Sequence, residues 1–196
     1  MKKAFTTLEK TLLFQLVYPT TDTTMPALPK LKLKPRLHAL DTGLINYSTN
    51  MVKDIITAED IADVYRGRIA EHITGQELLA MSNSIMNKLQ FWVREKKQSS
   101  AEVDYLYPYN GKLIPIEVKS GSIGKLRSLH QFMDEAPHTL AVRVWQGSYS
   151  VEKAKTIAGK EFTLLNLPFY LVHRIERELD KLENGNFSQR SLSYSQ

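Results

Sequence analysis

The sequence predicts an α/β domain in which a mixed β-sheet is flanked by helices, and three observations carry this prediction. The first is a β-hairpin signal at Asn110-Gly111, the second is an amphipathic helix pattern over residues 57–80, and the third is a run of further strand patterns between residues 88 and 167. With 196 residues, 42% of them hydrophobic and 24% charged, the chain is long enough to bury a core.

The composition also excludes several classes of protein. No stretch approaches the ~20 consecutive apolar residues that span a bilayer. Glu9 and Lys10 interrupt the apolar start of the chain, and no small-residue cleavage site follows, so we expect no signal peptide. The absence of cysteine excludes disulfides and thiolate zinc sites and fits a cytoplasmic location. The net charge of +5 permits contact with nucleic acid.

Residues 1–50 are predicted to form a short helix from Thr7 to Val17, a polar turn and an extended basic segment. Leucines alternate with lysines and an arginine from residue 30 to residue 40, which is typical of a half-buried strand. Pro35 indicates that this strand is an edge strand or is broken. Two interpretations of the cations stay open, namely contact with phosphates and a solvated strand face.

The pattern over residues 57–80 is the clearest helix signal. Thr57 suits the N-cap, and the carboxylates that follow it suit the first turn. Gly67 and Gly75 flank Glu71, and glycine inside a helix costs about 1 kcal/mol relative to alanine. We therefore expect close approach to another backbone, with Glu71 pointing into that contact; the alternative is a surface glutamate. The apolar stripe consists of Ile61, Val64, Tyr65, Ile69 and Ile73.

The second half of the chain is predicted to be rich in strands. The expected strands cover residues 88–94, 102–107, 112–119, 139–145 and 162–167. A helix is expected from Leu126 to Asp134, and a last helix is expected to open at Pro168 and run to about Leu182. The polar tail, residues 183–196, has no periodicity and is expected to be disordered.

The register of the hairpin brings acidic residues together. Counting outward from a two-residue turn at Asn110-Gly111, Asp104 faces Glu117 and Glu102 faces Lys119. Directly opposite side chains lie roughly 5 Å apart, and like charges placed in this way are destabilising. Such a pair is tolerated when a cation lies between the carboxylates or when water screens them. The hairpin is therefore a candidate site for a divalent metal ion.

Four residues form the candidate site: Glu71, Asp104, Glu117 and Lys119. Three carboxylates suit Mg²⁺ or Mn²⁺, which polarise a bound water and neutralise charge on a phosphoryl group. Glu117 and Lys119 share one face of their strand because side chains alternate, so Lys119 would orient the water or stabilise a developing anion. Glu102 is expected to pair with Lys119 or to stay solvated.

This set resembles the PD-(D/E)XK nuclease superfamily, whose core carries a helix carboxylate, an Asp and a Glu-x-Lys motif on a hairpin. The resemblance matches Glu71, Asp104, Glu117 and Lys119 and implies a restriction-endonuclease-like fold with metal-dependent cleavage of DNA. Val103 stands where the superfamily commonly has a proline.

A longer resemblance covers roughly residues 5–170. The chain resembles the uncharacterised C-terminal domain of predicted bacterial and archaeal AAA-type ATPases, which carry a P-loop module and a winged-helix segment before this domain. The sequence lacks the G-x-x-x-x-G-K-[ST] phosphate loop, so any ATP dependence is expected to belong to residues outside it. The motifs that carry the resemblance are Leu40-Asp41-Thr42-Gly43-Leu44-Ile45-Asn46, Gly67-x-x-x-Glu71, Gln76-Glu77-Leu78, Phe91-Trp92-x-Arg94, Glu102-Val103-Asp104, Ile116-Glu117-Val118-Lys119-Ser120-Gly121, Ser128-Leu129 and Phe132.

The resemblance also implies a division of the chain. Residues 1–50 would be the remnant of a winged-helix segment with a basic strand, residues 51–182 the nuclease-like domain, and residues 183–196 the disordered tail. Two functions follow as hypotheses. The first is Mg²⁺- or Mn²⁺-dependent hydrolysis of DNA. The alternative is a non-catalytic module that binds DNA or a protein and partners or regulates an ATPase.

Several other residues have two interpretations each. His72 either assists a metal site or packs within the protein. Arg94 contacts phosphate or forms a structural salt bridge, and Gln131 is a weaker candidate for substrate contact. The two tryptophans are expected in the core. Three alternating tyrosines of the hairpin either stack on bases or pack within the sheet: Tyr105, Tyr107 and Tyr109.

Overall fold

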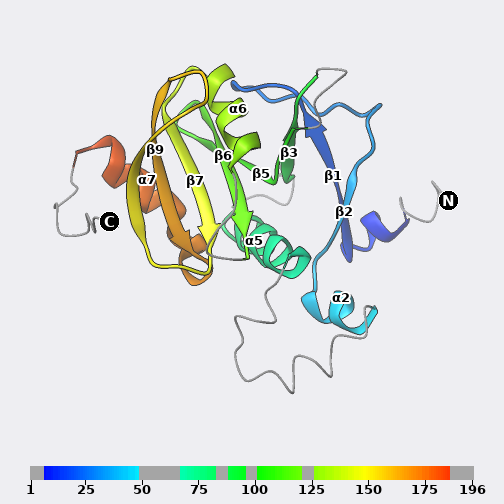
Figure 1. The fold of residues 1–196 in the computed structure, drawn as a ribbon. Coiled ribbons are helices and arrows are strands. Elements are labelled where there is room, and N and C mark those ends of the chain that lie inside the picture. The colour runs from blue at the N-terminus through cyan, green and yellow to red at the C-terminus, as the bar shows by residue number, and fades with distance from the viewer. Residues whose placement is uncertain (1–6, 49–66, 83–87, 96–100, 121–125, 186–196) are drawn as a thin grey trace.

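The computed structural model describes residues 7–48, 67–82, 88–95, 101–120 and 126–185, which form an α/β fold with two mixed sheets (Figure 1). The first sheet has the strand order β2-β1-β3-β4, and the second has the order β5-β6-β7-β9-β8. The elements of the first sheet and its helix are β1 (Phe14–Thr20), β2 (Arg36–Ala39), α2 (Thr42–Ser48), β3 (Gln90–Val93) and β4 (Glu102–Val103). The remaining elements are α5 (Arg68–Ala80), β5 (Tyr105–Tyr109), β6 (Lys112–Lys119), α6 (Arg127–Glu135), β7 (Leu140–Trp145), β8 (Ser150–Lys155), β9 (Glu161–Pro168), the 3₁₀ helix η1 (Phe169–Arg174) and α7 (Ile175–Glu183).

The predicted hairpin is confirmed. Asn110 and Gly111 have φ angles of 44° and 72°, the positive values that a tight primed turn requires at both central positions. The ladder runs from Tyr109 opposite Lys112 to Tyr105 opposite Ile116, as predicted. It ends there because the chain bends at Asp104 and the preceding residues join the other sheet.

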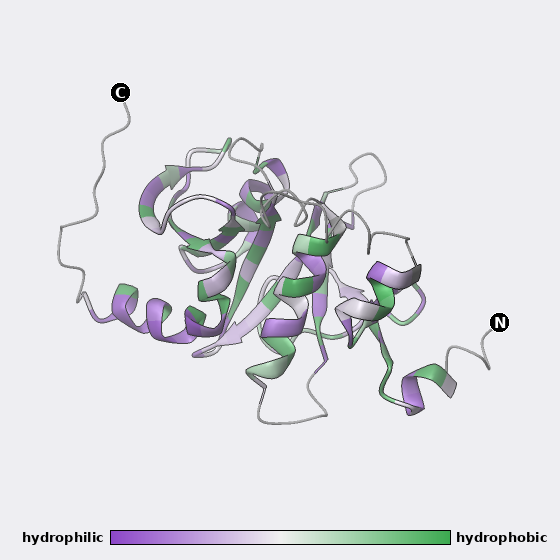
Figure 2. Ribbon diagram, turned by 90° about the horizontal axis from the view of Figure 1, so that it is seen from below, coloured by the Kyte–Doolittle hydropathy of each residue, from purple (hydrophilic) through white to green (hydrophobic). Residues whose placement is uncertain are grey.

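The centre of the second sheet is parallel and covered on both faces. Strands β6, β7 and β9 run parallel and are almost wholly buried, as expected when helices lie on both sides of a sheet. Helix α6 covers one face with Leu129, Phe132 and Met133. The other face packs against α5, η1 and α7 (Figure 1). Helix α7 turns a largely hydrophilic surface outward (Figure 2).

The N-terminal segment differs from its prediction. Only residues 7–10 of the expected Thr7–Val17 helix are helical, and the chain then forms β1. Strand β1 pairs with β2 through residues 14–17 and with β3 through residues 18–20. This pairing on both sides outweighs the local helix pattern. Strand β2 is an edge strand that starts directly after Pro35, as predicted.

Helix α5 begins at Arg68, because Gly67 has a φ of 57°, which no residue of a right-handed helix has, so the predicted helix over residues 57–80 is not continuous through Gly67. The cap at Thr57 and the start of the apolar stripe lie outside the described residues. Gly75 is inside the helix, and a Cβ there would lie 2.6 Å from His38 Cε1 and 2.7 Å from Tyr105 Oη. The predicted approach to another backbone is therefore wrong: the close contacts at Gly75 are with side chains, and a Cβ at Gly67 would have no described atom within 4 Å.

Three smaller differences concern the second half of the chain. Strand β8 was not predicted, because its sequence SVEKAK is largely polar and it pairs at an edge. The last helix starts as 3₁₀ before it becomes α7, and Glu183, placed in the predicted tail, ends α7. Residues 186–196 of that tail lie outside the described residues. Within the described ranges, no helix is long and apolar enough to cross a bilayer.

Candidate metal and phosphate site

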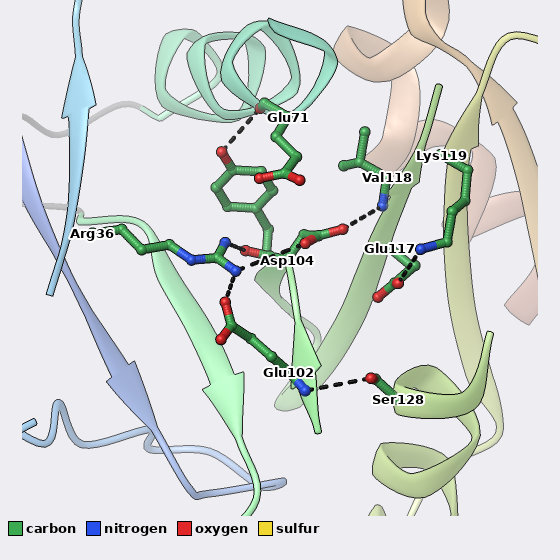
Figure 3. Close-up of polar contacts among 9 residues, drawn as sticks. Arg36, Glu71, Glu102, Asp104, Glu117, Val118, Lys119 and Ser128 are labelled. Atoms are coloured by element: carbon green, nitrogen blue, oxygen red, sulfur yellow. Dashed lines mark hydrogen bonds and ion pairs between the residues drawn. The ribbon is translucent and has the colours of Figure 1, made fainter. Parts of the chain in front are cut away.

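The bend between β4 and β5 brings Asp104 beside β6. Its Oδ2 accepts a hydrogen bond of 2.8 Å from the backbone N–H of Val118 (Figure 3). The ladder between β5 and β6 ends at Tyr105 and Ile116, so Asp104 is not the ladder partner of Glu117 as predicted. Asp104 instead contacts the backbone of Val118, the residue after Glu117. The carboxylates of Asp104 and Glu117 nevertheless lie close enough for the charge of Asp104 to act on Glu117.

Glu117 is the most unusual residue of the site. It is 5% exposed, and its Oε1 accepts a hydrogen bond of 2.6 Å from Lys119 Nζ. Its Oε2 is buried and has no hydrogen-bond partner among the described residues. Burial, followed by the charge of Asp104, raises the pKa of Glu117 to about 7, although Lys119 acts in the opposite direction. The Oε2 atom of Glu117, which has no described partner, can therefore coordinate a cation.

Burial also raises the pKa of Asp104, against three groups that favour its charged form. In order of size these are the N–H of Val118, Arg36 and Lys119. The site therefore holds two carboxylates whose negative charges are both disfavoured by burial. Lys119, the cation of the predicted set, is paired with Glu117. A further positive charge near these oxygens would relieve both carboxylates.

Glu71 reaches the site from α5. The side chain of Glu71 extends from the helix toward Asp104 in Figure 3, and its charge contributes to the raised pKa of Glu117. The helix is fixed at this point because Tyr105 Oη donates a hydrogen bond of 2.9 Å to the backbone carbonyl of Glu71. Gly75 lets the same tyrosine approach closely. The structure thus brings all four predicted residues to one region.

Arg36 belongs to this region, and the sequence did not predict its place there. From β2, its Nη1 donates a hydrogen bond of 3.4 Å to the backbone carbonyl of Asp104, and its Nη2 lies 3.9 Å from Asp104 Oδ1. Its guanidinium lies 4.4 Å from the ring centre of Phe91. The alternating pattern of residues 30–40 predicts a strand that contains Arg36, but only the unpredicted strand β1, which pairs with both β2 and β3, joins that strand to the first sheet near the site.

The predicted pairing of Glu102 with Lys119 is wrong. Because Glu102 lies on β4 opposite Val93, it cannot face Lys119. Its side chain is 42% exposed, in line with the alternative of a solvated residue, and its carboxylate forms an ion pair with Arg36. Its backbone N–H donates a hydrogen bond to Ser128 Oγ. The predicted charge pairing across the hairpin is therefore replaced by an ion pair between β2 and β4 of the first sheet and by a contact between β4 and helix α6.

The remaining candidates have structural contacts. His72 Nε2 lies 2.6 Å from the carbonyl of Ala39, and Arg94 forms a salt bridge of 3.2 Å with Glu135. Gln131 Oε1 is buried without a hydrogen-bond partner in the described part of the chain.

Tyr105 and Tyr109 are buried in the core and Tyr107 packs beside them, which favours packing over base stacking. Trp92 is fully buried as predicted, whereas Trp145 is half-buried.

The three carboxylates do not form a closed ligand set as they stand. Among the residues described, no three His, Asp or Glu side chains are arranged so that they could hold one metal ion. The donor chemistry is that of a hard cation, because all the groups offered are carboxylate oxygens. The unpartnered Oε2 of Glu117 fits such an ion, as does its neighbour Asp104.

Comparisons with known proteins place the chain in a family. Residues 66–170 match the family described as Domain of unknown function (DUF4143), and this match contains Glu71, Asp104, Glu117 and Lys119. No curated protein was found to match the chain. No solved structure was found to match it either. Because the matched region is more than half of the chain, the protein belongs to the DUF4143 family.

Proposed function

We propose that this chain is a nuclease-like domain that hydrolyses DNA phosphodiester bonds with the help of Mg²⁺ or Mn²⁺. Its core would be of the restriction-endonuclease-like kind, with Glu71, Asp104, Glu117 and Lys119 as the site. The proposal is supported by the position of these residues at one end of a mixed sheet covered on both faces by helices.

The observation that carries the proposal is the state of Glu117. A buried carboxylate normally has hydrogen-bond partners for both oxygens, and an unsatisfied charged group is costly. Glu117 has one oxygen on Lys119 and the other without a partner in the described part of the chain, beside the half-buried carboxylate of Asp104. Ionisable groups whose pKa is shifted by burial and by a nearby charge, as that of Glu117 is, cluster at functional sites.

Each residue of the site would have a separate part in the reaction. Asp104 and Glu117, with Glu71 from the helix, would hold the cation, which supplies water activation and neutralises charge on the phosphoryl group. The N–H of Val118 fixes the orientation of the Asp104 carboxylate. Lys119 Nζ lies at the carboxylate of Glu117, where its ammonium group can orient the attacking water or stabilise the anion that develops.

The family setting of this function is a further part of the proposal. We infer that the chain corresponds to the C-terminal domain of AAA-type ATPases and acts in the cytoplasm with a P-loop module as partner. Residues 1–50 would then derive from a winged-helix segment. Two residues of the motifs that carry this resemblance contact each other: Thr42 Oγ1 donates to the Gln76 side chain, which in turn donates to the carbonyl of Leu40.

A second function is favoured by a different observation. Arg36 supplies a positive charge 3.9 Å from Asp104 Oδ1, and this charge partly balances the carboxylate without a metal ion. In a non-catalytic module that binds DNA or protein, Arg36 would replace the ion permanently. The nuclease function and the binding module therefore differ in whether a metal ion is needed.

Cleavage assays separate the two functions. Single-stranded and duplex DNA would be incubated with the wild type, Lys119→Ala and the control Lys155→Ala, with Mg²⁺, with Mn²⁺ and with a chelator. The nuclease proposal predicts metal-dependent cleavage that falls by about 100-fold or more in Lys119→Ala and is unchanged in Lys155→Ala. If the wild type and Lys119→Ala are equally inert while DNA binding persists, the binding module is the correct function.

A further inference from the structure

A row of polar side chains crosses the second sheet and starts at Glu117. On the three neighbouring strands, Arg143 of β7 lies beside Glu117, Asn166 of β9 lies beside Arg143, and Ser150 of β8 lies beside Asn166. Residues in register on adjacent strands share one face of a sheet. The residues before and after Arg143 and Asn166 belong to the apolar core of the opposite face. The row therefore continues the candidate site across three more strands.

Arg143 is held in place but incompletely paired. Its guanidinium carbon lies 4.2 Å from the ring centre of Trp145, and its Nη2 lies 3.6 Å from Glu152 Oε1. The side chain of Arg143 is only 14% exposed, whereas that of Glu152 is 50% exposed. The Nε of Arg143 is buried and has no hydrogen-bond partner among the described residues. The guanidinium therefore lacks a described acceptor at Nε, and a molecule from solvent can reach it only through the exposed 14% of the side chain.

Asn166 fixes the position of the carboxylate that holds Arg143. It is fully buried, and its Nδ2 donates to Ser150 Oγ at 2.9 Å and to Glu152 Oε1 at 2.5 Å. Glu152 therefore has three polar neighbours that limit its movement, namely Asn166, Arg143 and Ser150, whose Oγ donates to Oε1 at 3.4 Å. The Oδ1 of Asn166 is buried without a partner in the described part of the chain, as is the Oε2 of Glu117. Three strands in succession thus carry an unsatisfied polar atom on the same face.

We propose that Arg143 binds a phosphate group of the nucleic-acid backbone next to the phosphate that is cleaved, with Trp145 and the Asn166–Glu152 pair positioning its guanidinium. This inference rests on the proposed function, because it assigns a second phosphate contact to the same site. Adjacent strands are separated by about 4.8 Å. A phosphodiester chain bound over Glu117 and running across the strands therefore passes over Arg143.

The chemistry of the row favours phosphate over a purely structural role. A partly buried guanidinium is stabilised when all its N–H groups have acceptors, and leaving one unpaired is costly. Its planar fork matches two oxygens of a phosphate. Glu117 does not provide these acceptors, since its Oε1 is bound to Lys119 and its Oε2 has no described partner. An oxyanion from outside the chain that contacts the exposed part of the Arg143 side chain would supply the missing acceptor.

Fluorescence anisotropy with labelled single-stranded DNA, duplex DNA and single-stranded RNA tests this inference on the full chain. Binding is measured with a chelator present, so that cleavage does not interfere, at several salt concentrations. The variants are Arg143→Gln and Arg143→Lys. The control is Lys155→Gln, which removes an exposed cation of the same sheet that is paired with Glu161. Thermal unfolding is followed for each variant, and Arg143→Lys keeps the charge if Arg143→Gln does not fold.

We expect Arg143→Gln to weaken binding about tenfold and to reduce the slope of log K against log salt by about 0.7–0.9, the value for one phosphate contact. Arg143→Lys should keep the slope but lose part of the affinity, because the fork is lost, and Lys155→Gln should change neither. In Mg²⁺, Arg143→Gln should raise KM more than it lowers kcat.

The outcomes separate the two claims. If the Arg143 variants bind with wild-type affinity and slope while the wild type cleaves DNA, the phosphate contact is wrong and the nuclease function stands. If binding depends on Arg143 but no metal ion supports cleavage, the phosphate contact stands and the catalytic function is wrong. If the wild type binds none of the three nucleic acids at low salt, both claims are wrong.

Discussion

At the scale of single residues, Glu117 shows how function and stability oppose each other. Burial and Asp104 act against its negative charge, and Lys119 is too exposed, with 28% of its side chain accessible, to offset them fully. The folded protein therefore favours the protonated carboxyl group. Because the raised pKa lies above the unfolded value, the stability contributed by Glu117 is complete below about pH 4.5 and is lost as the pH rises through about 7.

Replacing Glu117 by Gln should consequently stabilise the metal-free protein above pH 7. We expect the free energy of unfolding to rise by about 3 kcal/mol at pH 8, since the pKa of Glu117 is raised from 4.5 to about 7 and each unit of pKa shift corresponds to about 1.4 kcal/mol. The difference from the wild type should vanish toward pH 4.5. Urea unfolding at both pH values, with Glu161→Gln as an exposed control, measures it. A variant less stable than the wild type at pH 8 would show that the pair with Lys119 is net stabilising.

Arg36 provides a second prediction at this scale, because its charge competes with a metal ion for Asp104. Arg36→Met should raise the affinity for Mn²⁺ by at least about threefold and lower the free energy of unfolding by about 1 kcal/mol through the lost ion pair with Glu102. Arg94→Met, which loses a comparable salt bridge to Glu135, is the matched control. Calorimetric titration measures the affinity, and an unchanged value in Arg36→Met would mean that Arg36 only anchors Glu102.

At the scale of elements, the contact between β2 and α5 positions the helix that carries Glu71. The rings of His38 and His72 stack with centroids 4.5 Å apart, and a Cβ at Gly75 would touch His38. Burial, and then the charge of His72, lowers the pKa of His38 to about 4. A histidine with a lowered pKa contributes stability that is present above about pH 6.5 and lost as the pH falls toward 4.

His38→Phe should remove this sensitivity to acid while it keeps the stacked ring. For the wild type, we expect His38 to reduce the free energy of unfolding by up to about 3 kcal/mol between pH 7 and pH 4. The variant should lose correspondingly less, and at pH 7 the two proteins should differ little. Chemical unfolding at a series of pH values provides the comparison. Parallel pH profiles for the two proteins would contradict the role assigned to His38.

The elements that sequence predicted best are those with strong local signals. Strand β6 and the hairpin turn were predicted to the residue, because Asn110-Gly111 fixes the register and the strand is buried on both faces. Strand β1 was missed because the residues at its start also fit a helix pattern. The extended conformation of β1 is stabilised by pairing with β2 and β3, which the sequence does not show. The break at Gly67 was missed for a related reason, since a glycine within an apolar stripe is compatible with both a helix and its end.

At the scale of the whole molecule, the candidate site joins parts of the chain that are far apart in sequence. Glu71 comes from α5, Asp104 from the bend before β5 and Glu117 from β6. The place of Arg36 and its pairing with Glu102 could not be predicted, because both depend on the strand order β2-β1-β3-β4 of the first sheet. Sequence spacing thus predicted which carboxylates lie in one region but not the arginine beside them, and the metal chemistry stays a prediction.

The central claim is that the buried carboxylates hold a divalent cation, and calorimetric titration of the full chain with Mn²⁺ tests it most directly. The account predicts one saturable site per chain, lost in Asp104→Asn and Glu117→Gln and retained in the control Glu161→Gln. The affinity of the wild type should increase as the pH rises through about 7, where Glu117 loses its proton. Absence of saturable binding, or binding that both variants retain, would contradict the account.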